Sequence, residues 1–399
     1  MAHVLLRDPK KCERCGYCRS FVSCSKGCVG CGACSISCPN DAIEIIEIKK
    51  PGAKNLSVVI DGKAFFVPKT TVKEALEGLG FEFLKYPEYS DKKEIFTPCG
   101  TGGCLSCAIE IDGELMPSCT TPLKDGMIIN TREDLTPKRL VQGFGGHGVG
   151  GVGTPWPIKE ISGFVEVACF TSGCNFRCPQ CQNWVTTYRK LGEPKTPRYA
   201  AEKMTLARER FSVDRMAISG GECTLNRRWL LSFVKELKEL NNDEYAHIHV
   251  DTNGSILTDD YIDDLVGAGT TDIGIDLKSL DIGTFIKITG IEDRDLAQKY
   301  QKTAWGAVKY IIDNHNIFLG IGIPYNSDFV SLDEMAKMGD KIFKLSADVQ
   351  VCVLDYRPAF RKKNVSRPNY AEMGKVYSTL LGTGLKTVIC QTAYGYIGP

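Results

Sequence analysis

Several features are scarce in this chain. It has only five histidines, and its 49 Lys and Arg residues nearly balance 48 Asp and Glu residues. A balanced charge gives no electrostatic footprint for nucleic acid or an anionic membrane. We find no apolar run long enough to span a bilayer and no charged-then-apolar leader. We therefore expect a cytoplasmic protein with neither a nucleic-acid nor a membrane partner, and histidine-based hydrolysis has little support.

Cysteine, in contrast, is abundant, with 19 residues. Disulfide-rich chains are usually short and exported, whereas these cysteines gather in Cys-x2-Cys clusters without an export signal, which favours metal binding in a reducing compartment. Cys169, Cys223, Cys352 and Cys390 lie outside the clusters. Lone cysteines are most often buried and inert. Cys352 and Cys390 lie on expected strands, where hydrogen-atom donation is the alternative role.

The length of 399 residues predicts two or three domains. Changes in sequence pattern divide the chain into residues 1–50, 51–135, a Gly/Pro-rich linker at 136–160, and 161–399. The linker contains seven glycines between residues 143 and 153, followed by Pro155-Trp156-Pro157. A phosphate-binding loop is the alternative, but it needs a following helix, which the prolines disfavour.

The first segment carries eight cysteines. The run from Cys28 to Cys38, which ends in Cys-Pro, has the spacing of bacterial ferredoxins, in which the last cysteine binds the neighbouring cluster. The first half departs from that pattern because five residues separate Cys18 from Cys24 and no proline follows. We therefore expect two [4Fe-4S] clusters, with a zinc ribbon as the alternative and Cys24 as the doubtful ligand. The expected ligand sets are Cys12, Cys15, Cys18 and Cys38, and Cys24, Cys28, Cys31 and Cys34.

The second segment alternates polar and apolar residues around Asp61-Gly62 and Asp112-Gly113, which are strong hairpin signals. With a short helix at 72–79, this pattern predicts a β-grasp module. Four cysteines inside it have the plant-type spacing for one [2Fe-2S] cluster, with zinc as the alternative: Cys99, Cys104, Cys107 and Cys119.

The third segment begins with a strand at 164–168 and a loop in which Cys174, Cys178 and Cys181 are spaced Cys-x3-Cys-x2-Cys. Three thiolates leave one iron of a [4Fe-4S] cluster without a cysteine ligand, so that iron is open and reactive. Zinc ligands or plain loop thiols are the alternatives. Beyond the loop, short strands and amphipathic helices alternate, with strands at 215–219, 247–251, 272–278, 318–323 and 349–355 and a core-facing helix at 228–240.

Ligands of parallel βα barrels gather at the carboxyl ends of the strands. Gly220-Gly221-Glu222 follows one strand, Asp251-Thr252 ends the next, and Asp276-x-Lys278 ends the one after. Helix capping is the alternative role for the two aspartates. His247 and His249, which share one strand face, are expected to be structural.

This set of motifs resembles the radical S-adenosylmethionine (SAM) superfamily, within it the pyruvate formate-lyase activating enzyme branch. The resemblance implies an α/β fold with a partial (β/α)6 barrel, preceded here by a small ferredoxin-like α+β module and the β-grasp module. It also implies that Gly220, Gly221 and Glu222 bind the amino group of SAM, and that Asp251, Thr252, Asp276 and Lys278 surround SAM and a monovalent cation. Cys223 stands where proline is more usual.

The resemblance implies that SAM is cleaved reductively to methionine and a 5′-deoxyadenosyl radical. Three [4Fe-4S] clusters and one [2Fe-2S] cluster would then form a relay, fed by a low-potential donor such as ferredoxin or flavodoxin. A glycyl-radical activase is the first expectation, with a protein or small-molecule substrate at the barrel mouth. Activases usually carry their extra cysteines inside the barrel, so a maturase or C-methyltransferase stays open. A non-catalytic electron-transfer subunit is a further alternative, in which Cys169 would complete the third cluster.

Overall fold

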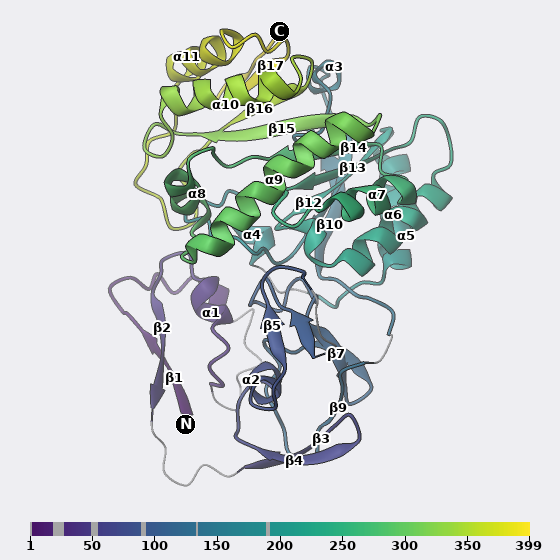
Figure 1. The fold of residues 1–399 in the computed structure, drawn as a ribbon, viewed down its shortest axis with the longest axis vertical. Coiled ribbons are helices and arrows are strands. Elements are labelled where there is room, and N and C mark those ends of the chain that lie inside the picture. Colours follow the sequence, from purple (N-terminus) through teal and green to yellow (C-terminus); the bar gives the residue numbers. More distant parts are fainter. Residues whose placement is uncertain (1, 19–27, 49–54, 89–92, 133–134, 189–191) are drawn as a thin grey trace. The chain divides into compact units, whose positions relative to one another are not determined.

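The protein is described here from a computed structural model, which covers residues 2–18, 28–48, 55–88, 93–132, 135–188 and 192–399 (Figure 1). The chain divides into two compact units. Unit 1 comprises Met1–Gln142, Thr171–Asn175 and Trp184–Thr196, and unit 2 comprises Gly143–Phe170, Phe176–Asn183 and Pro197–Pro399. No helix in the described part of the chain is both long and apolar enough to cross a membrane.

Unit 1 begins with an antiparallel strand pair. In this pair β1 (Ala2–Arg7) lies along β2 (Ile43–Ile48), and the short helix α1 (Ala33–Ile36) falls between them in sequence. Cys34, Cys38, Ala42 and Ile43 form a small buried cluster, against which Cys12 and Cys18 pack. Cysteines from both halves of the expected two-cluster module therefore share one core. Cys24 lies outside the described residues.

The second part of unit 1 is built on a five-stranded sheet with the order β4-β3-β9-β7-β8. Its elements are β3 (Leu56–Ile60), β4 (Lys63–Val67), α2 (Val72–Glu77), β7 (Ala108–Ile111), β8 (Glu114–Pro117) and β9 (Ile128–Asn130), with a separate parallel pair of β5 (Glu82–Leu84) and β6 (Glu94–Phe96). Both expected Asp-Gly hairpins are present, since Ile60 pairs with Lys63 and Ile111 with Glu114. Asp61 and Gly62 both have positive φ, as a type I′ turn requires.

A nine-stranded sheet that runs from β10 to β18 in sequence order organises unit 2. Each of the pairs from β12 to β17 is parallel, and β18 returns antiparallel to β17. The strands are β10 (Val141–His147), β11 (Glu166–Thr171), β12 (Arg215–Gly220), β13 (His247–Thr252), β14 (Asp272–Asp276), β15 (Phe318–Tyr325), β16 (Gln350–Asp355), β17 (Val388–Thr392) and β18 (Gly395–Ile397). This mostly parallel sheet is typical of a radical SAM partial barrel and confirms the expected fold class.

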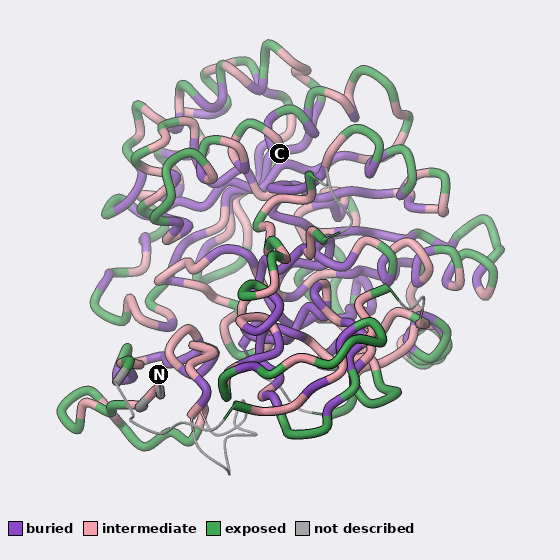
Figure 2. The backbone as a smooth tube through the Cα atoms, turned by 60° about the horizontal axis from the view of Figure 1, so that its bottom comes forward, coloured by how far each residue is buried: buried purple, intermediate pink, exposed green. Residues whose placement is uncertain are grey.

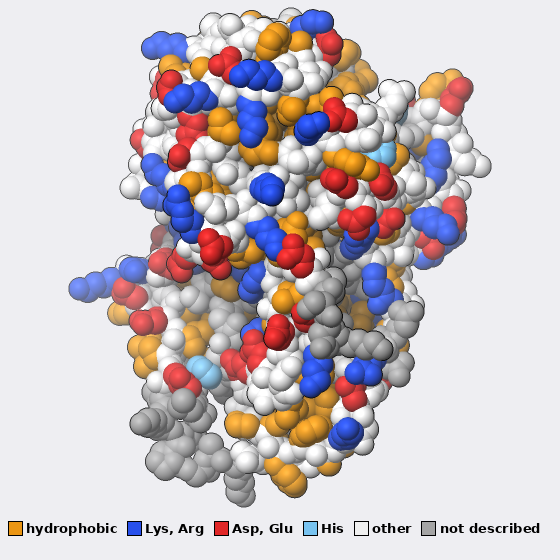
Figure 3. Space-filling view, in the orientation of Figure 1, with side chains coloured by type: hydrophobic (Ala, Val, Ile, Leu, Met, Phe, Trp, Pro, Cys, Tyr) orange, Lys and Arg blue, Asp and Glu red, His pale blue; other side chains and the backbone are white. Residues whose placement is uncertain are grey.

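The long helices follow the strands as crossover segments and contact one another in the order α5, α6, α7 and α9, and then α10 and α11 (Figure 1). They are α5 (Pro197–Phe211), α6 (Arg227–Leu240), α7 (Asp259–Ala268), α8 (Ile282–Thr289), α9 (Arg294–Asn314), α10 (Leu332–Leu345) and α11 (Tyr370–Leu381); α3 (Trp156–Lys159), α4 (Trp184–Thr187) and the 3-10 turn η3 (Cys223–Leu225) are short. The strands of this sheet are mostly buried (Figure 2), whereas basic and acidic side chains are interspersed over the face drawn in Figure 3.

The segment at 136–160, expected as a linker, contains regular structure. This segment carries β10 and α3, and its glycine-rich middle packs on the sheet of unit 2. A Cβ on Gly320 would lie 2.1 Å from the carbonyl oxygen of Val152, and a Cβ on Gly274 would lie 2.5 Å from the nitrogen of Gly153. The glycines thus allow two backbones to approach closely. The boundary between the two units falls between Gln142 and Gly143, within this segment, and its part from Gly143 onward packs on the sheet.

Candidate functional site

The four cysteines of the expected [2Fe-2S] site are all buried within unit 1. The Sγ atoms of Cys99 and Cys104 are 3.1 Å apart, and Cys119 contacts both Cys99 and Cys107. Hydrogen bonds from Cys104 and Cys119 hold the pKa of Cys99 well below its usual range, whereas burial raises that of Cys104. Four sulfur donors enclosed together fit a four-thiolate cluster, and three of them lie on a loop in which Gly100 and Gly102 have positive φ.

The cysteines of the amino-terminal module are less enclosed. Cys15 is exposed, Cys12 and Cys18 are half-buried, and Cys34 and Cys38 are buried. The sulfur of Cys38 accepts a hydrogen bond from the nitrogen of Ala42 at 3.3 Å, the kind of amide contact that tunes a cluster. Among the described residues, no three His, Cys, Asp or Glu side chains are arranged to hold a single metal ion.

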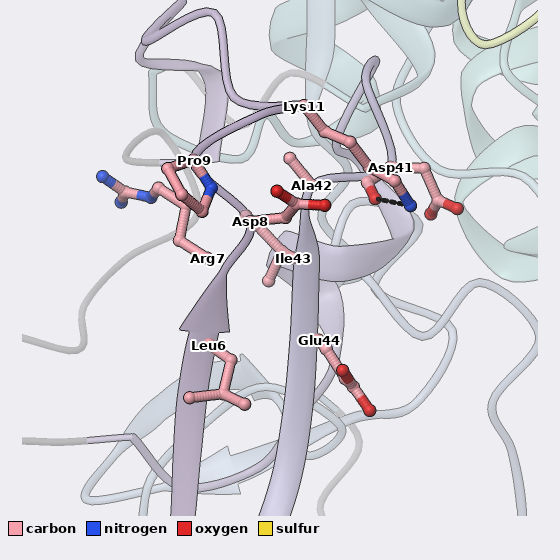
Figure 4. Close-up of a pocket in the computed structure, with 9 residues that line it drawn as sticks. All are labelled: Leu6, Arg7, Asp8, Pro9, Lys11, Asp41, Ala42, Ile43 and Glu44. Atoms are coloured by element: carbon pink, nitrogen blue, oxygen red, sulfur yellow. Dashed lines mark hydrogen bonds between the residues drawn. The ribbon is translucent and has the colours of Figure 1, made fainter.

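A pocket of about 600 Å³ lies at the ends of β1 and β2 in the same module (Figure 4). Arg7, Asp8, Lys11, Asp41 and Glu44 contribute its charges, and the ammonium of Lys11 reaches the carbonyl of Asp41 at 3.4 Å. None of the predicted site residues lines this pocket. Its mixed charges therefore define no catalytic chemistry.

The three-cysteine loop follows β11. Cys174 belongs to unit 1, Cys178 and Cys181 belong to unit 2, and all three are half-buried. Within unit 2, the nitrogen of Arg177 donates to the carbonyl of Thr289 at 2.7 Å, and the amide of Gln180 donates to the carbonyl of Ile288 at 3.2 Å. The end of α8 therefore fixes the part of the loop that carries Cys178.

Two of the residues predicted at strand ends lie beside Cys178. Lys278 donates to the carboxylate of Asp276 at 2.8 Å and lies 3.5 Å from the hydroxyl of Tyr356. Burial raises the pKa of Cys178 to about 12, and the positive charge of Lys278 acts in the opposite direction. Although burial lowers the pKa of Lys278, Asp276 raises it well above the usual range, so this ammonium stays charged beside the thiol.

Glu222 and Thr252 are brought together at the next strand ends. The buried carboxylate of Glu222 accepts hydrogen bonds from the hydroxyl of Thr252 at 2.6 Å, the nitrogen of Asn253 at 2.7 Å, and both the nitrogen and the hydroxyl of Thr224. Gly220, at a φ of 116°, accepts from the side chain of Asn183 through its carbonyl, and Gly221 links it to Glu222. Glu222 thus ties the end of β13 to the turn after β12.

Asp251 has different partners. Its carboxylate accepts from Gly153 at 3.2 Å and contacts Nε2 of His249 at 2.8 Å. The other ring nitrogen of His249 lies 3.3 Å from Glu166, a buried carboxylate that also binds His147 and the hydroxyl of Thr154. Although burial lowers the pKa of His249, Asp251 and Glu166 raise it to about 9. The histidine is thus a buried structural cation.

Tyr356, on a segment that also resembles the activating-enzyme branch, contacts Lys278 in unit 2. Sequence reasoning missed three residues in unit 1, Arg139, Ser172 and Gly173, which contact the [2Fe-2S] loop or its surroundings. None belongs to a spaced motif, so no local signal could have found them. The remaining cysteines Cys169, Cys223, Cys352 and Cys390 are buried, and the thiol of Cys223 donates to the carbonyl of Asp251 at 3.1 Å.

The parallel sheet, with cysteine sites before it and within it, defines an iron-sulfur enzyme of the partial-barrel class. Residues 169–332 match the family described as the radical SAM superfamily, which confirms the expected superfamily for that part of the chain. Residues 53–134 match a 2Fe-2S iron-sulfur cluster binding domain, and residues 26–44 match a 4Fe-4S binding domain. The protein therefore has SAM and a [4Fe-4S] cluster as cofactors and contains a [2Fe-2S] domain.

Two curated relatives illustrate the breadth of the similarity. A protein of Methanocaldococcus jannaschii, provisionally named a glycyl-radical enzyme activating enzyme, is 26% identical over 215 residues, which are 53% of this chain and 75% of the relative. The GTP 3′,8-cyclase of Gloeobacter violaceus is 35% identical over 120 residues, which are 29% of this chain and 35% of the cyclase. The match to the cyclase thus leaves most of that relative uncovered.

Solved structures are more distant. Streptococcus suis SuiB bound to its precursor peptide SuiA aligns with a TM-score of 0.39 and 16% identity, over 52% of this chain and 43% of that chain. Escherichia coli coproporphyrinogen III oxidase aligns with a TM-score of 0.37 and 14% identity, over 47% of this chain and 45% of that chain. Such likenesses carry no information about the substrate.

Proposed function

We propose that this enzyme cleaves SAM reductively to initiate radical chemistry on a glycyl radical enzyme or another protein, and that it holds its own electron relay of three [4Fe-4S] clusters and one [2Fe-2S] cluster. When bound, the cluster at Cys174, Cys178 and Cys181 would supply one electron to SAM, whose C5′–S bond breaks to give methionine and the 5′-deoxyadenosyl radical. The grouping of Cys178, Lys278 and Asp276 supports the proposal most directly.

The chain's residues would position SAM beside that motif. The ammonium of Lys278 can pair with the carboxylate of SAM. Asp276 keeps one buried carboxylate oxygen without a hydrogen-bond partner among the described residues, which suits a cation or a polar ligand group. Glu222, whose carboxylate is oriented by four hydrogen bonds, would hold the amino group of SAM by its negative charge.

The test is SAM cleavage by anaerobically reconstituted protein with a strong reductant, with 5′-deoxyadenosine followed by mass spectrometry. We expect product from the wild type and none above background from Cys178→Ala. Cys390→Ala, which removes a buried thiol outside the motifs, is the matched control and should retain activity. Absence of product from fully loaded wild type would contradict the proposal and favour a pure electron-transfer role.

The activase role is supported by the relative from Methanocaldococcus jannaschii, whose match covers 75% of that protein. Its test is an electron paramagnetic resonance (EPR) spectrum of a glycyl radical after incubation with a glycyl radical enzyme. The cyclase relative favours GTP as a second candidate substrate. Formation of a bond at C3′ requires loss of hydrogen there, so deuterium transfer from 3′-deuterated GTP to 5′-deoxyadenosine would select this candidate over the activase.

A further inference from the structure

The loop that carries the [2Fe-2S] cysteines touches the residues just before Cys174, all within unit 1. A Cβ on Gly103 would lie 2.9 Å from the nitrogen of Gly173, and a Cβ on Gly173 would lie 2.7 Å from the nitrogen of Cys104. No side chain fits between these two backbones. Gly173 also has a φ of 84°, which favours glycine. Cys104, an expected ligand of the [2Fe-2S] cluster, thus contacts Gly173, which directly precedes Cys174 of the three-cysteine motif.

Hydrogen bonds hold the Ser172-Gly173 side of this contact in place. The nitrogen of Ser172 donates to the carbonyl of Leu140 at 3.0 Å, and the nitrogen of Gly173 donates to the carbonyl of Thr187 at 2.8 Å. The hydroxyl of Ser172 also donates to the carbonyl of Thr186 at 3.1 Å. The segment that leads into Cys174 is therefore fixed against the [2Fe-2S] loop.

A buried cation lies beside this contact. Arg139 is fully buried, and its guanidinium donates to the hydroxyl of Thr171 at 3.3 Å and to the carbonyl of Ser172 at 3.2 Å. Ser172 in turn lies against the [2Fe-2S] loop, because a Cβ on Gly103 would lie 3.1 Å from the carbonyl carbon of Ser172. A [2Fe-2S] centre with four thiolates is an anion that gains another negative charge on reduction. A buried cation nearby therefore favours its reduced form.

We propose that the contact between Gly103-Cys104 and Gly173-Cys174 is the electron bridge from the [2Fe-2S] site to the three-cysteine motif, and that Arg139 sets the potential of the donor. This inference rests on the proposed function. One electron leaves the reduced [2Fe-2S] centre, which returns to two ferric ions, and the same electron reduces the [4Fe-4S] centre of the three-cysteine motif. A soluble low-potential one-electron donor restores the [2Fe-2S] centre.

The amino-terminal module offers a competing route in the same unit. Tyr17, between Cys15 and Cys18, donates to the carbonyls of Trp184 and Val185, and its ring lies 4.9 Å from that of Trp184. This contact reaches the chain three residues after Cys181, whereas the Gly103-Gly173 contact reaches it one residue before Cys174. The Gly103-Gly173 contact thus leaves fewer covalent bonds between the expected ligands of the two clusters, and it is the better candidate for the direct bridge.

The decisive experiment compares Gly103→Ala with wild type as reconstituted full-length protein. An alanine at 103 would force the backbone at 172–173 or at 104 to shift. Gly78→Ala is the matched control in the same module, because its Cβ would meet nothing closer than 3.4 Å. The protein is reduced, mixed with SAM and frozen at intervals, and the EPR signal of the reduced [2Fe-2S] centre is followed together with 5′-deoxyadenosine.

In wild type and Gly78→Ala, we expect the [2Fe-2S] signal to decay as fast as 5′-deoxyadenosine forms. In Gly103→Ala, the decay should slow about tenfold or more at unchanged iron content, as for other changes next to a metal site. An undiminished decay rate in Gly103→Ala with full clusters would overturn the inference, as would a wild type that cleaves SAM while the [2Fe-2S] centre stays reduced. Failure of wild type to cleave SAM would instead refute the proposed function.

A second variant pair keeps the inference testable if Gly103→Ala loses its clusters. Arg139→Gln should lower the reduction potential of the [2Fe-2S] centre in an EPR-monitored titration, whereas Arg139→Lys should restore most of the difference. Tyr17→Phe, which keeps the ring of the competing route, should leave that potential and the decay rate unchanged. Equal potentials in all three variants would show that Arg139 is only structural, and slowed decay in Tyr17→Phe alone would favour the other route.

Discussion

The interiors of the two units are filled in different ways. Around Cys99, Cys104, Cys107 and Cys119 of unit 1, sulfur atoms face one another in a buried space. On the inner face of the sheet in unit 2, the segment at Gly151–Thr154 packs on strand glycines, and buried charges are paired, as in Arg215 with Asp272 at 3.1 Å. The four buried thiols of unit 1 require a cofactor, whereas this face of the sheet in unit 2 is filled by the chain's own backbone and by paired charges. Loss of iron should therefore destabilise the [2Fe-2S] region of unit 1 more than the sheet of unit 2.

The largest expected effect comes from Cys107→Ala, which removes one ligand of the enclosed cluster. We expect loss of the [2Fe-2S] absorption and a cost of more than about 4 kcal/mol to the module, because metal binding contributes to its folding. Hydrogen exchange should rise in residues 99–119 and stay unchanged in β13 to β15. Cys390→Ala, the same chemical change in unit 2, should keep the cluster. Equal hydrogen exchange at residues 99–119 in both variants would contradict the proposed difference between the units.

The self-filled interior should instead be sensitive to added volume. Gly320→Ala places a methyl group against the carbonyl of Val152, and overpacking of this kind costs about 1–3 kcal/mol or more. Gly306→Ala in α9, where a Cβ meets nothing within 4 Å, should stabilise the protein by about 0.5–1 kcal/mol. Urea unfolding of unit 2 gives both values. If Gly320→Ala left the free energy of unfolding unchanged, the 151–154 segment would not stay packed on the sheet.

The paired charges predict a pH dependence confined to unit 2. His249 has a folded pKa of about 9, above the ordinary value of about 6.5. Its contribution is therefore complete below about pH 6.5 and is lost as pH rises through 9, by roughly 1–3 kcal/mol. Unfolding free energies measured between pH 6 and 10 should fall for wild type and change less for His249→Gln. A wild-type profile as flat as that of the variant would contradict the pairing.

The smallest effect is expected at the surface. Arg198 lies 2.9 Å from both Glu202 and Glu236, but half of its side chain is exposed. Water and salt screen such pairs. Arg198→Ala should leave the midpoint of unfolding within error of wild type in either unit. A clear decrease that disappears in high salt would show that surface pairs also contribute to the difference between the units.

Local patterns in the sequence predicted most of this fold. Asp61-Gly62 and Asp112-Gly113 identified both hairpins, and the apolar periodicity at 228–240 predicted α6 within one residue. Each of these signals depends on neighbours in sequence, through turn geometry or helical spacing. The glycines at 143–153 have no such period, so their packing against Gly274 and Gly320 could not be predicted.

The candidate sites divide in the same way. Motif spacing identified the cysteines, whereas strand-end positions and the family resemblance brought Glu222 and Thr252 into one prediction, and these two side chains do meet at 2.6 Å. The roles assigned to them in binding SAM stay predictions. The contact of Glu166 with His249 joins residues 83 positions apart, and Arg139 reaches Ser172 from 33 positions away. Such long-range contacts leave no trace in a spacing pattern.

The close approach of Val152 to Gly274 and Gly320 affects which substitutions this protein tolerates. A saturation-mutagenesis library would find these glycines among the least replaceable positions, although their role is to admit another backbone. Intolerance to substitution would then mark two different things, the chemistry of the strand ends and the fit of a filled interior. A screen that scores folded yield separately from turnover would distinguish them, because glycine variants would lose both, whereas a Lys278 variant would lose turnover first.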